Sequence, residues 1–261
     1  MKKILILLFC AISVAQAQQG GTVNIRFDHF VGSEVLNLDT HTYKNAAGNE
    51  FKVSLFQYFV SNIKLLKKDG SAYTVPQDKS YFLIKESNED SKTITLTDIP
   101  KGVYTGVSFL IGVDSARSAS DISQRKGSLD VAGEAQDMYW AWNSGYIFVK
   151  MEGVSAQASS SNNVFMYHIG LFGGIGVKKT LNNIKYANVS FGKEPLKVQS
   201  GKNAPVIVLI ADAMKLLNGP NKIDMAENPS IMGGPFSTKV AENYQSMFSF
   251  SGFLPPIKAA K

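Results

Sequence analysis

Short segments with a β-type pattern recur along almost the whole chain, and turn residues rather than helices separate them. In residues 22–30 apolar and polar side chains alternate, which places every second residue from Val23 to His29 on one face of a strand. Closely spaced strands without intervening helices argue against a parallel α/β sheet. The pattern predicts an all-β chain folded as an antiparallel β-sandwich. The other strand candidates are residues 51–66, 81–85, 93–96, 103–113, 145–152, 163–169, 184–191 and 205–210.

Helical periodicity is confined to the C-terminal part of the chain. Residues 211–217 close on Asn218-Gly219-Pro220, and residues 238–248 form a second periodic run. We therefore expect a small helical C-terminal elaboration of the sandwich. The sequence shows no internal repeat and no domain boundary, so residues 18–261 are expected to form a single domain.

The N-terminal segment has the organisation of a secretory signal peptide. Lys2 and Lys3 precede an apolar run over residues 4–14, and Ala15-Gln16-Ala17 supplies the small residues of a cleavage site. The apolar run is shorter than the roughly 20 residues that a membrane-spanning helix needs. We expect residues 1–17 to be removed after Ala17 and the protein to be periplasmic or secreted.

Export would also remove the only cysteine, Cys10, which lies inside the signal segment. A mature chain without cysteine excludes a disulfide framework, a zinc-thiolate site and a thiol nucleophile. Removing Lys2 and Lys3 lowers the formal net charge from +6 to +4, and the remaining lysines are scattered along the chain. This distribution favours solubility rather than nucleic-acid binding, which needs a clustered basic face.

Two histidines on strand candidates are the main metal-ligand candidates. His29 shares a strand face with apolar residues, and His168 shares one with Val164 and Met166. One interpretation is two core histidines, each hydrogen-bonded to a backbone carbonyl. The other is that the two imidazoles converge on a metal, for which copper is favoured because imidazole and thioether ligands suit it. His41 is expected to be a polar loop residue.

Both tryptophans of the chain lie in one aromatic segment, residues 138–146. Trp140 and Trp142 are two residues apart and share a face if the segment is extended. Paired aromatic side chains are usually packed in the core, but exposed ones stack on sugar rings or act as redox-active groups. A third interpretation makes one of them the substrate of an oxidising partner.

A loop rich in Ser, Asp and Gly over residues 114–136 is longer than a packing connection needs. Asp114 and Asp130 bracket it, and their carboxylates suit calcium, although capping of the loop by Asp side chains is the simpler interpretation. The sequence contains none of the common hydrolase, metalloprotease or nucleotide-binding motifs. The Gly-rich run over residues 170–176 is most simply a loop. We therefore predict that the protein is not an enzyme.

Five segments carry a shared pattern: residues 27–29, 58–63, 110–115, 138–153 and 167–170. Together they resemble one family, the MbnP-like domain, which is similar to the copper-repressible CorA and MopE proteins. The resemblance covers nearly the whole mature chain and is most specific in the Trp-Asn-Ser-Gly-Tyr and Gly-Val-Asp-Ser runs.

The resemblance implies an exported β-sandwich that binds copper through histidines, with a tryptophan oxidised to kynurenine in some members by a partner dihaem peroxidase of the MauG type. In the copper-binding members the modified tryptophan lies two residues before a histidine. Here Phe27 precedes His29 and Trp142 follows Trp140, so that local arrangement is absent. We expect a copper-binding protein with His29 and His168 as ligands. The alternative is an interaction or glycan-binding module without a metal.

Overall fold

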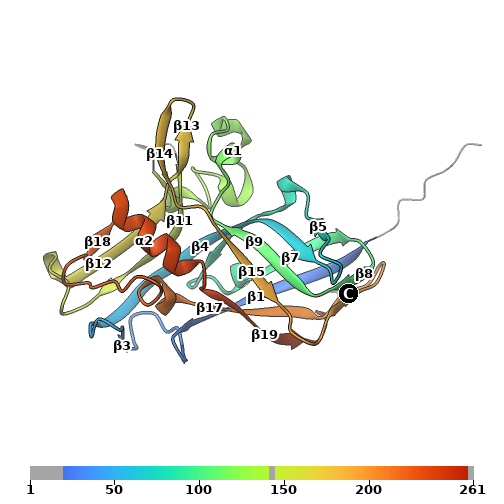
Figure 1. Cartoon of the computed structure of the whole chain (residues 1–261), viewed down its shortest axis with the longest axis horizontal. Coiled ribbons are helices and arrows are strands. Elements are labelled where there is room, and N and C mark those ends of the chain that lie inside the picture. Colours follow the sequence, from blue (N-terminus) through green and yellow to red (C-terminus); the bar gives the residue numbers. More distant parts are fainter. Residues whose placement is uncertain (1–19, 141–144, 258–261) are drawn as a thin grey trace, which may run out of the picture.

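The computed structural model describes residues 20–140 and 145–257. The predicted signal segment and Trp142 lie outside these residues. Two sheets dominate the described part of the chain, and they pack face to face (Figure 1). The all-β sandwich and the C-terminal helix are confirmed.

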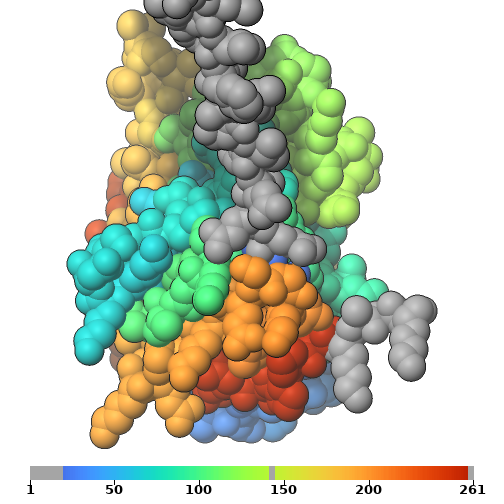
Figure 2. Space-filling model, turned by 90° about the vertical axis from the view of Figure 1, so that its right-hand side faces the viewer, coloured from blue at the N-terminus to red at the C-terminus, as the bar shows by residue number. Residues whose placement is uncertain are grey.

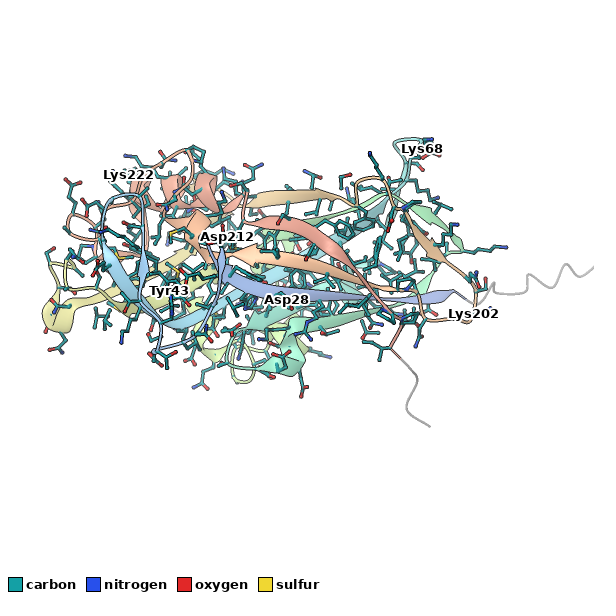
Figure 3. The ribbon with its side chains drawn as sticks, turned by 90° about the horizontal axis from the view of Figure 1, so that it is seen from below. Asp28, Tyr43, Lys68, Lys202, Asp212 and Lys222 are labelled. Carbon is teal, nitrogen blue, oxygen red and sulfur yellow. The ribbon has the colours of Figure 1, made fainter. Side chains whose placement is uncertain are left out.

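The smaller sheet has the strand order β19-β17-β1-β2, with β7 paired to β1. In Figure 3 the blue β1 runs along the molecule beside the orange β17. These two strands are parallel, with Ile25 opposite Ile207 and His29 opposite Ala211. The sheet is therefore mixed rather than wholly antiparallel. The strands are β1 (Gly21–Val31), β2 (Glu34–Val35), β7 (Thr93–Ile99), β17 (Val206–Asp212) and β19 (Phe248–Leu254).

The larger sheet has the order β15-β9-β4-β11-β12-β18, with four further strands paired to β4 or β11. Its longest strand is β4, whose alternate residues Phe56 and Tyr58 face the smaller sheet. The strands are β3 (Tyr43–Lys44), β4 (Glu50–Leu66), β5 (Ala72–Thr74), β6 (Tyr81–Lys85), β9 (Gly106–Ile111), β10 (Tyr139–Trp140), β11 (Gly145–Val154), β12 (Val164–Gly170), β15 (Lys185–Ser190) and β18 (Ser230–Ile231).

Aromatic rings fill the space between the two sheets. The ring of Phe27 on β1 makes edge contacts with Tyr58, Phe109 and Phe248 at centroid distances of 5.9 to 6.1 Å. Each of these side chains comes from a different strand, so the contacts join both sheets into one core. The alternation predicted for β1 is confirmed, because Val23, Ile25 and Phe27 are fully buried.

The connection between β9 and β10 covers the other face of the larger sheet. The Tyr146 hydroxyl donates to the carbonyl of Leu129 at 2.7 Å, and the ammonium of Lys85 donates to the carbonyl of Glu134 at 3.1 Å. The larger sheet is thus covered on both faces where β6 and β11 run. The connection contains α1 (Ser115–Ser118), η3 (Ile122–Gln124), η4 (Gly127–Leu129) and η5 (Gln136–Met138).

Two small sheets complete the strand pairing. The first, β13 (Phe172–Ile175) with β14 (Lys178–Asn182), stands at the same end of the molecule as α1 (Figures 1 and 2). The second joins β8 (Gly102–Tyr104) to β16 (Leu196–Val198). The remaining short turns are η1 (Gln77–Lys79), η2 (Glu89–Lys92) and η6 (Ser161–Asn163).

The C-terminal region differs in its details from the expectation. The run over residues 211–217 forms only the 3-10 turn η7 (Ala213–Leu216), because β17 continues to Asp212. The second run forms α2 (Gly234–Tyr244), and Phe248 begins β19 instead of ending the helix. Pairing of β19 with β17 completes the smaller sheet, and this long-range pairing decides the conformation of Phe248.

Candidate functional site

His29 lies between the sheets, where the alternation of β1 predicts it. Its ring makes an edge contact with Phe56 at a centroid distance of 5.2 Å, and its side chain is 1% exposed. Nδ1 lies 2.6 Å from a carboxylate oxygen of Glu86, and Nε2 lies 2.9 Å from the hydroxyl of Tyr58. A carboxylate accepts hydrogen bonds only, so in the neutral imidazole Nδ1–H donates to Glu86 and Nε2 accepts from Tyr58. Both ring nitrogens are therefore occupied.

A cleft of about 280 Å³ reaches this histidine from the surface, and Glu86 and Lys92 line it. The ammonium of Lys92 lies 3.3 Å from Glu86 and 2.7 Å from Glu89. Burial acts against the charged form of Lys92, but the two carboxylates outweigh it and raise the Lys92 pKa. The charge of Glu86 is thus balanced by a fixed cation at the mouth of the cleft.

His168 lies on the opposite face of the larger sheet. It pairs with Lys150 of β11, which pairs with Gln57 of β4. Gln57 is the neighbour of Tyr58, and adjacent residues of a strand point to opposite faces. Since Tyr58 points towards His29, the side chain of His168 points away from it.

This geometry corrects the expectation that His29 and His168 converge on one ion. The thickness of the ten-stranded sheet separates their side chains, so they cannot share a metal. Each imidazole hydrogen-bonds to a carboxylate and not to a backbone carbonyl. The interpretation of two core histidines is therefore also wrong about the hydrogen-bond partner. Within the described residues, no group of three or more His, Cys, Asp or Glu side chains is placed to hold a metal ion.

The surroundings of His168 keep one imidazole nitrogen available. Nε2 lies 2.6 Å from a carboxylate oxygen of Glu152, which also accepts the ammonium of Lys150 at 3.3 Å. Nδ1 has no hydrogen-bond partner among the residues that the structure describes. Burial lowers the pKa of His168, the bond to Glu152 opposes this, and the charge of Lys150 adds to the lowering. The imidazole is therefore neutral near pH 7 and suited to ligate a metal.

The indole of Trp140 contacts β12 on the strand face that carries His168. A Cβ atom added to Gly170 would lie 2.8 Å from Cζ3 of Trp140, so the indole lies directly over this glycine. Gly170 follows His168 by two residues, and Met166 precedes it by two, so all three share one strand face. The fold therefore gathers an indole, an imidazole and a thioether along about 13 Å of one strand.

Asp114 and Asp130 have structural roles, and Trp140 is buried. Trp140 is 6% exposed, which does not fit a surface that stacks on sugars, and Trp142 lies outside the described residues. Asp114 caps α1 through the backbone N–H of Arg117 and accepts the Tyr81 hydroxyl, whereas Asp130 closes a turn at the N–H of Ala132. The two carboxylates thus have separate local partners, as the capping interpretation holds.

The C-terminal methionines pack in or against the core. Met225 and Met247 are buried, and Met214 and Met232 are partly buried beside it. His41 is partly exposed and pairs with Glu34 at 2.7 Å, as expected for a polar loop residue. Sequence reasoning did not single out Glu86 or Glu152 as histidine partners. For Glu152, the only available signal was its position two residues after Lys150 on a strand.

The comparisons with known proteins point to one fold. The chain matches a family model described as MbnP over residues 20–233. The solved structure of MbnP from Methylosinus trichosporium has a TM-score of 0.55 and 16% sequence identity, over 83% of this chain and 82% of that chain. At this level of identity the likeness shows a shared fold. None of the curated proteins matches the sequence.

Proposed function

Because the chain belongs to the MbnP family, we propose that it is an exported, non-catalytic copper-binding protein whose copper site is centred on His168. The family resemblance supports copper as the metal. The N-terminal sequence supports export, with residues 1–17 as the cleaved signal. None of the described helices is long and apolar enough to cross a membrane.

The observation that supports this site is the hydrogen bond between Nε2 of His168 and the carboxylate of Glu152. A metal-bound histidine typically donates its other N–H to a carboxylate, which fixes the tautomer and makes the ligating nitrogen more basic. Glu152 accepts from Nε2 of His168 at 2.6 Å and leaves Nδ1 for the metal. His29 has the same kind of carboxylate partner, but its second nitrogen accepts from Tyr58.

Met166 is the nearest soft ligand on the same strand face. A thioether beside an imidazole favours copper(I) over harder ions such as calcium or magnesium. His168 and Met166 are the two ligands that we propose from this strand face, and we propose that a further ligand comes from a modified residue or from solvent. Trp140, over Gly170 on the same face, is the candidate for modification.

We propose that a partner dihaem peroxidase of the MauG type oxidises Trp140. With hydrogen peroxide as the oxidant of the partner peroxidase, two equivalents cleave the C2–C3 bond of the indole and give N-formylkynurenine and two waters. Hydrolysis then releases C2 as formate and leaves kynurenine, whose carbonyl and aniline nitrogen are potential ligands. Intact mass after co-expression with an active partner tests this step. The mass change should vanish in Trp140→Phe and persist in Trp142→Phe, and the reverse pattern would assign the modification to Trp142.

Copper(I) titration of the metal-free mature protein against a chromophoric chelator tests the site itself. We expect His168→Ala to weaken binding by at least about 100-fold, and Glu152→Gln, which keeps a hydrogen-bond acceptor without the charge, by about 10–100-fold. Met166→Leu removes the thioether at similar volume and should weaken copper(I) more than copper(II).

His29→Ala is the matched control, because it removes a buried imidazole from the other side of the sheet. Its copper affinity should equal that of the wild type. Equal affinity in His168→Ala, or loss of binding only in His29→Ala, would refute the proposed site.

A further inference from the structure

Glu86, His29 and Tyr58 form a continuous hydrogen-bonded chain from the surface cleft into the core. The carboxylate of Glu86 is 14% exposed, whereas the imidazole and the phenol are buried. Nδ1–H of His29 donates to Glu86, so the basic nitrogen, Nε2, is directed inwards at the hydroxyl of Tyr58. A general base for a substrate in the cleft would direct that nitrogen outwards. The hydrogen-bonded chain therefore places Nε2 of His29 where it can receive a proton from Tyr58.

The other buried tyrosines of the described chain lack such an acceptor. The hydroxyls of Tyr43, Tyr104, Tyr146, Tyr167 and Tyr244 donate to the backbone carbonyls of Val35, Pro100, Leu129, Asn228 and Asn183. A backbone carbonyl accepts a hydrogen bond but is far too weak a base to take the proton. Tyr58 is the buried phenol that faces an ionisable base.

One further tyrosine, Tyr81, donates to a carboxylate, that of Asp114, at 2.5 Å. It lies near the surface, where the guanidinium of Arg117 is 5.1 Å from its ring centroid. A carboxylate is a weaker base than an imidazole by about two to three pKa units in model compounds. Proton transfer to Asp114 is therefore less favourable than transfer to His29, and the positive charge of Arg117 opposes the removal of an electron from the Tyr81 ring.

We propose that Tyr58 is a redox-active tyrosine that gives up one electron to an outer-sphere one-electron oxidant while its phenolic proton moves to Nε2 of His29. The O–H bond of Tyr58 breaks and an N–H bond forms on His29. The electron goes to the oxidant, which is reduced by one electron. The products are a neutral tyrosyl radical and an imidazolium that remains hydrogen-bonded to the carboxylate of Glu86.

Charge balance favours this coupled step over the alternatives. Starting from a neutral His29, the step places an imidazolium 2.6 Å from the carboxylate of Glu86, which Lys92 also contacts at 3.3 Å. Lys92 shares its charge with Glu89 at 2.7 Å, so after the step two carboxylates face two cations. Burial, followed by the charge of Glu86, raises the pKa of Tyr58 well above its ordinary value, so a free phenolate in the core is disfavoured. A radical cation that kept its proton would be an unpaired buried charge. The proton shift avoids both species.

The packing around Tyr58 protects the radical. The rings of Phe27, Phe56 and Phe248 lie 5.3 to 6.1 Å from the ring of Tyr58 between centroids. Phenylalanine is much harder to oxidise than tyrosine, so these neighbours do not donate an electron to quench the radical. The proposed copper ligands lie on the other face of the sheet, so this inference does not depend on them.

The test uses the copper-free mature protein with photogenerated ruthenium(III) tris-bipyridine as oxidant and a cobalt(III) quencher. Samples frozen after the flash are examined by electron paramagnetic resonance, with ring-deuterated tyrosine to separate tyrosyl from tryptophanyl signals. We expect a tyrosyl signal that is lost in Tyr58→Phe and retained in Tyr244→Phe and Tyr81→Phe. Tyr58→Phe removes only a hydroxyl, so the fold is expected to survive.

Two further variants test the role of the base. His29→Phe keeps an aromatic ring beside Phe56 but removes the proton acceptor, and it should abolish the signal. Glu86→Gln keeps the hydrogen bond without the charge and should reduce the radical yield, because the imidazolium loses its counter-ion. A tyrosyl signal that persists in Tyr58→Phe, disappears in Tyr81→Phe, or is unchanged in a folded His29→Phe protein would overturn the proposal.

Discussion

Replacing Gly170 by alanine tests the contact that places Trp140 beside His168. The added Cβ would lie 2.5 Å from the backbone carbonyl oxygen of Tyr146 and 2.8 Å from Cζ3 of Trp140. Both distances are shorter than real Cβ contacts allow, so β11 must move away from β12 or the indole must leave its position. Overpacking of this kind costs about 1–3 kcal/mol. Alanine also lowers the conformational entropy of the unfolded chain, which raises the unfolding free energy by about 0.4–1 kcal/mol.

The expected net loss is about 1–2 kcal/mol of unfolding free energy, or about 2–8 °C in Tm for a domain of this size. Urea and thermal unfolding measure it, and fluorescence in a Trp142→Phe background reports the environment of Trp140 alone. Gly233→Ala is the control, because a Cβ there meets nothing within 4 Å. Wild-type stability with an unchanged emission spectrum in Gly170→Ala would refute the described packing.

Three other predictions follow from the structure. Burial lowers the pKa of His168 in the folded protein. Between the folded and unfolded pKa values of His168 the unfolded chain therefore binds more protons, and the unfolding free energy should fall as pH decreases from about 6.5. Urea unfolding across this range should show a weaker dependence of the unfolding free energy on pH for His168→Gln. Asp114→Ala removes the N-cap of α1 and should lower the unfolding free energy by about 0.5–2 kcal/mol. Added calcium should leave the Tm of the wild type unchanged. A calcium-dependent rise in Tm would support the calcium interpretation instead. Phe27→Ala removes a fully buried ring and should cost about 3–5 kcal/mol in denaturant unfolding, and a loss below about 1 kcal/mol would contradict the described core.

Local alternation was sufficient to predict most of the strands and the side of each strand that is buried. It placed Phe27 and His29 on the buried face of β1, and both lie in the core. It did not predict that β1 runs parallel to β17, because about 180 residues separate the two strands and no hairpin sets their direction. The assignment of Phe248 to a helix failed for the same reason, since pairing with β17 makes it a strand residue.

The histidine pair shows a more specific limit of sequence reasoning. A period of two tells which residues share a face, but a sheet covered on both faces has two buried sides. His29 and His168 both lie on buried faces, yet the core covers one face and the connection before β10 extends over the other. Their partners Glu86 and Glu152 could not be identified, because a glutamate that accepts from a buried imidazole has no local pattern that separates it from a surface glutamate.

The connection between β9 and β10 is held on the larger sheet by a few polar contacts and by a small number of buried apolar side chains, among them Leu129, Ala135 and Met138. Lys85 and Lys150 donate to the carbonyls of Glu134 and Asp137, and Tyr146 donates to that of Leu129. Such a segment opens with a smaller free energy than the aromatic core, whose rings come from both sheets. Amide hydrogens of residues 114–138 should therefore exchange well before those of β1 and β4. If the proposed copper site is right, this local opening would uncover Lys150, the strand partner of His168, and would leave the core intact.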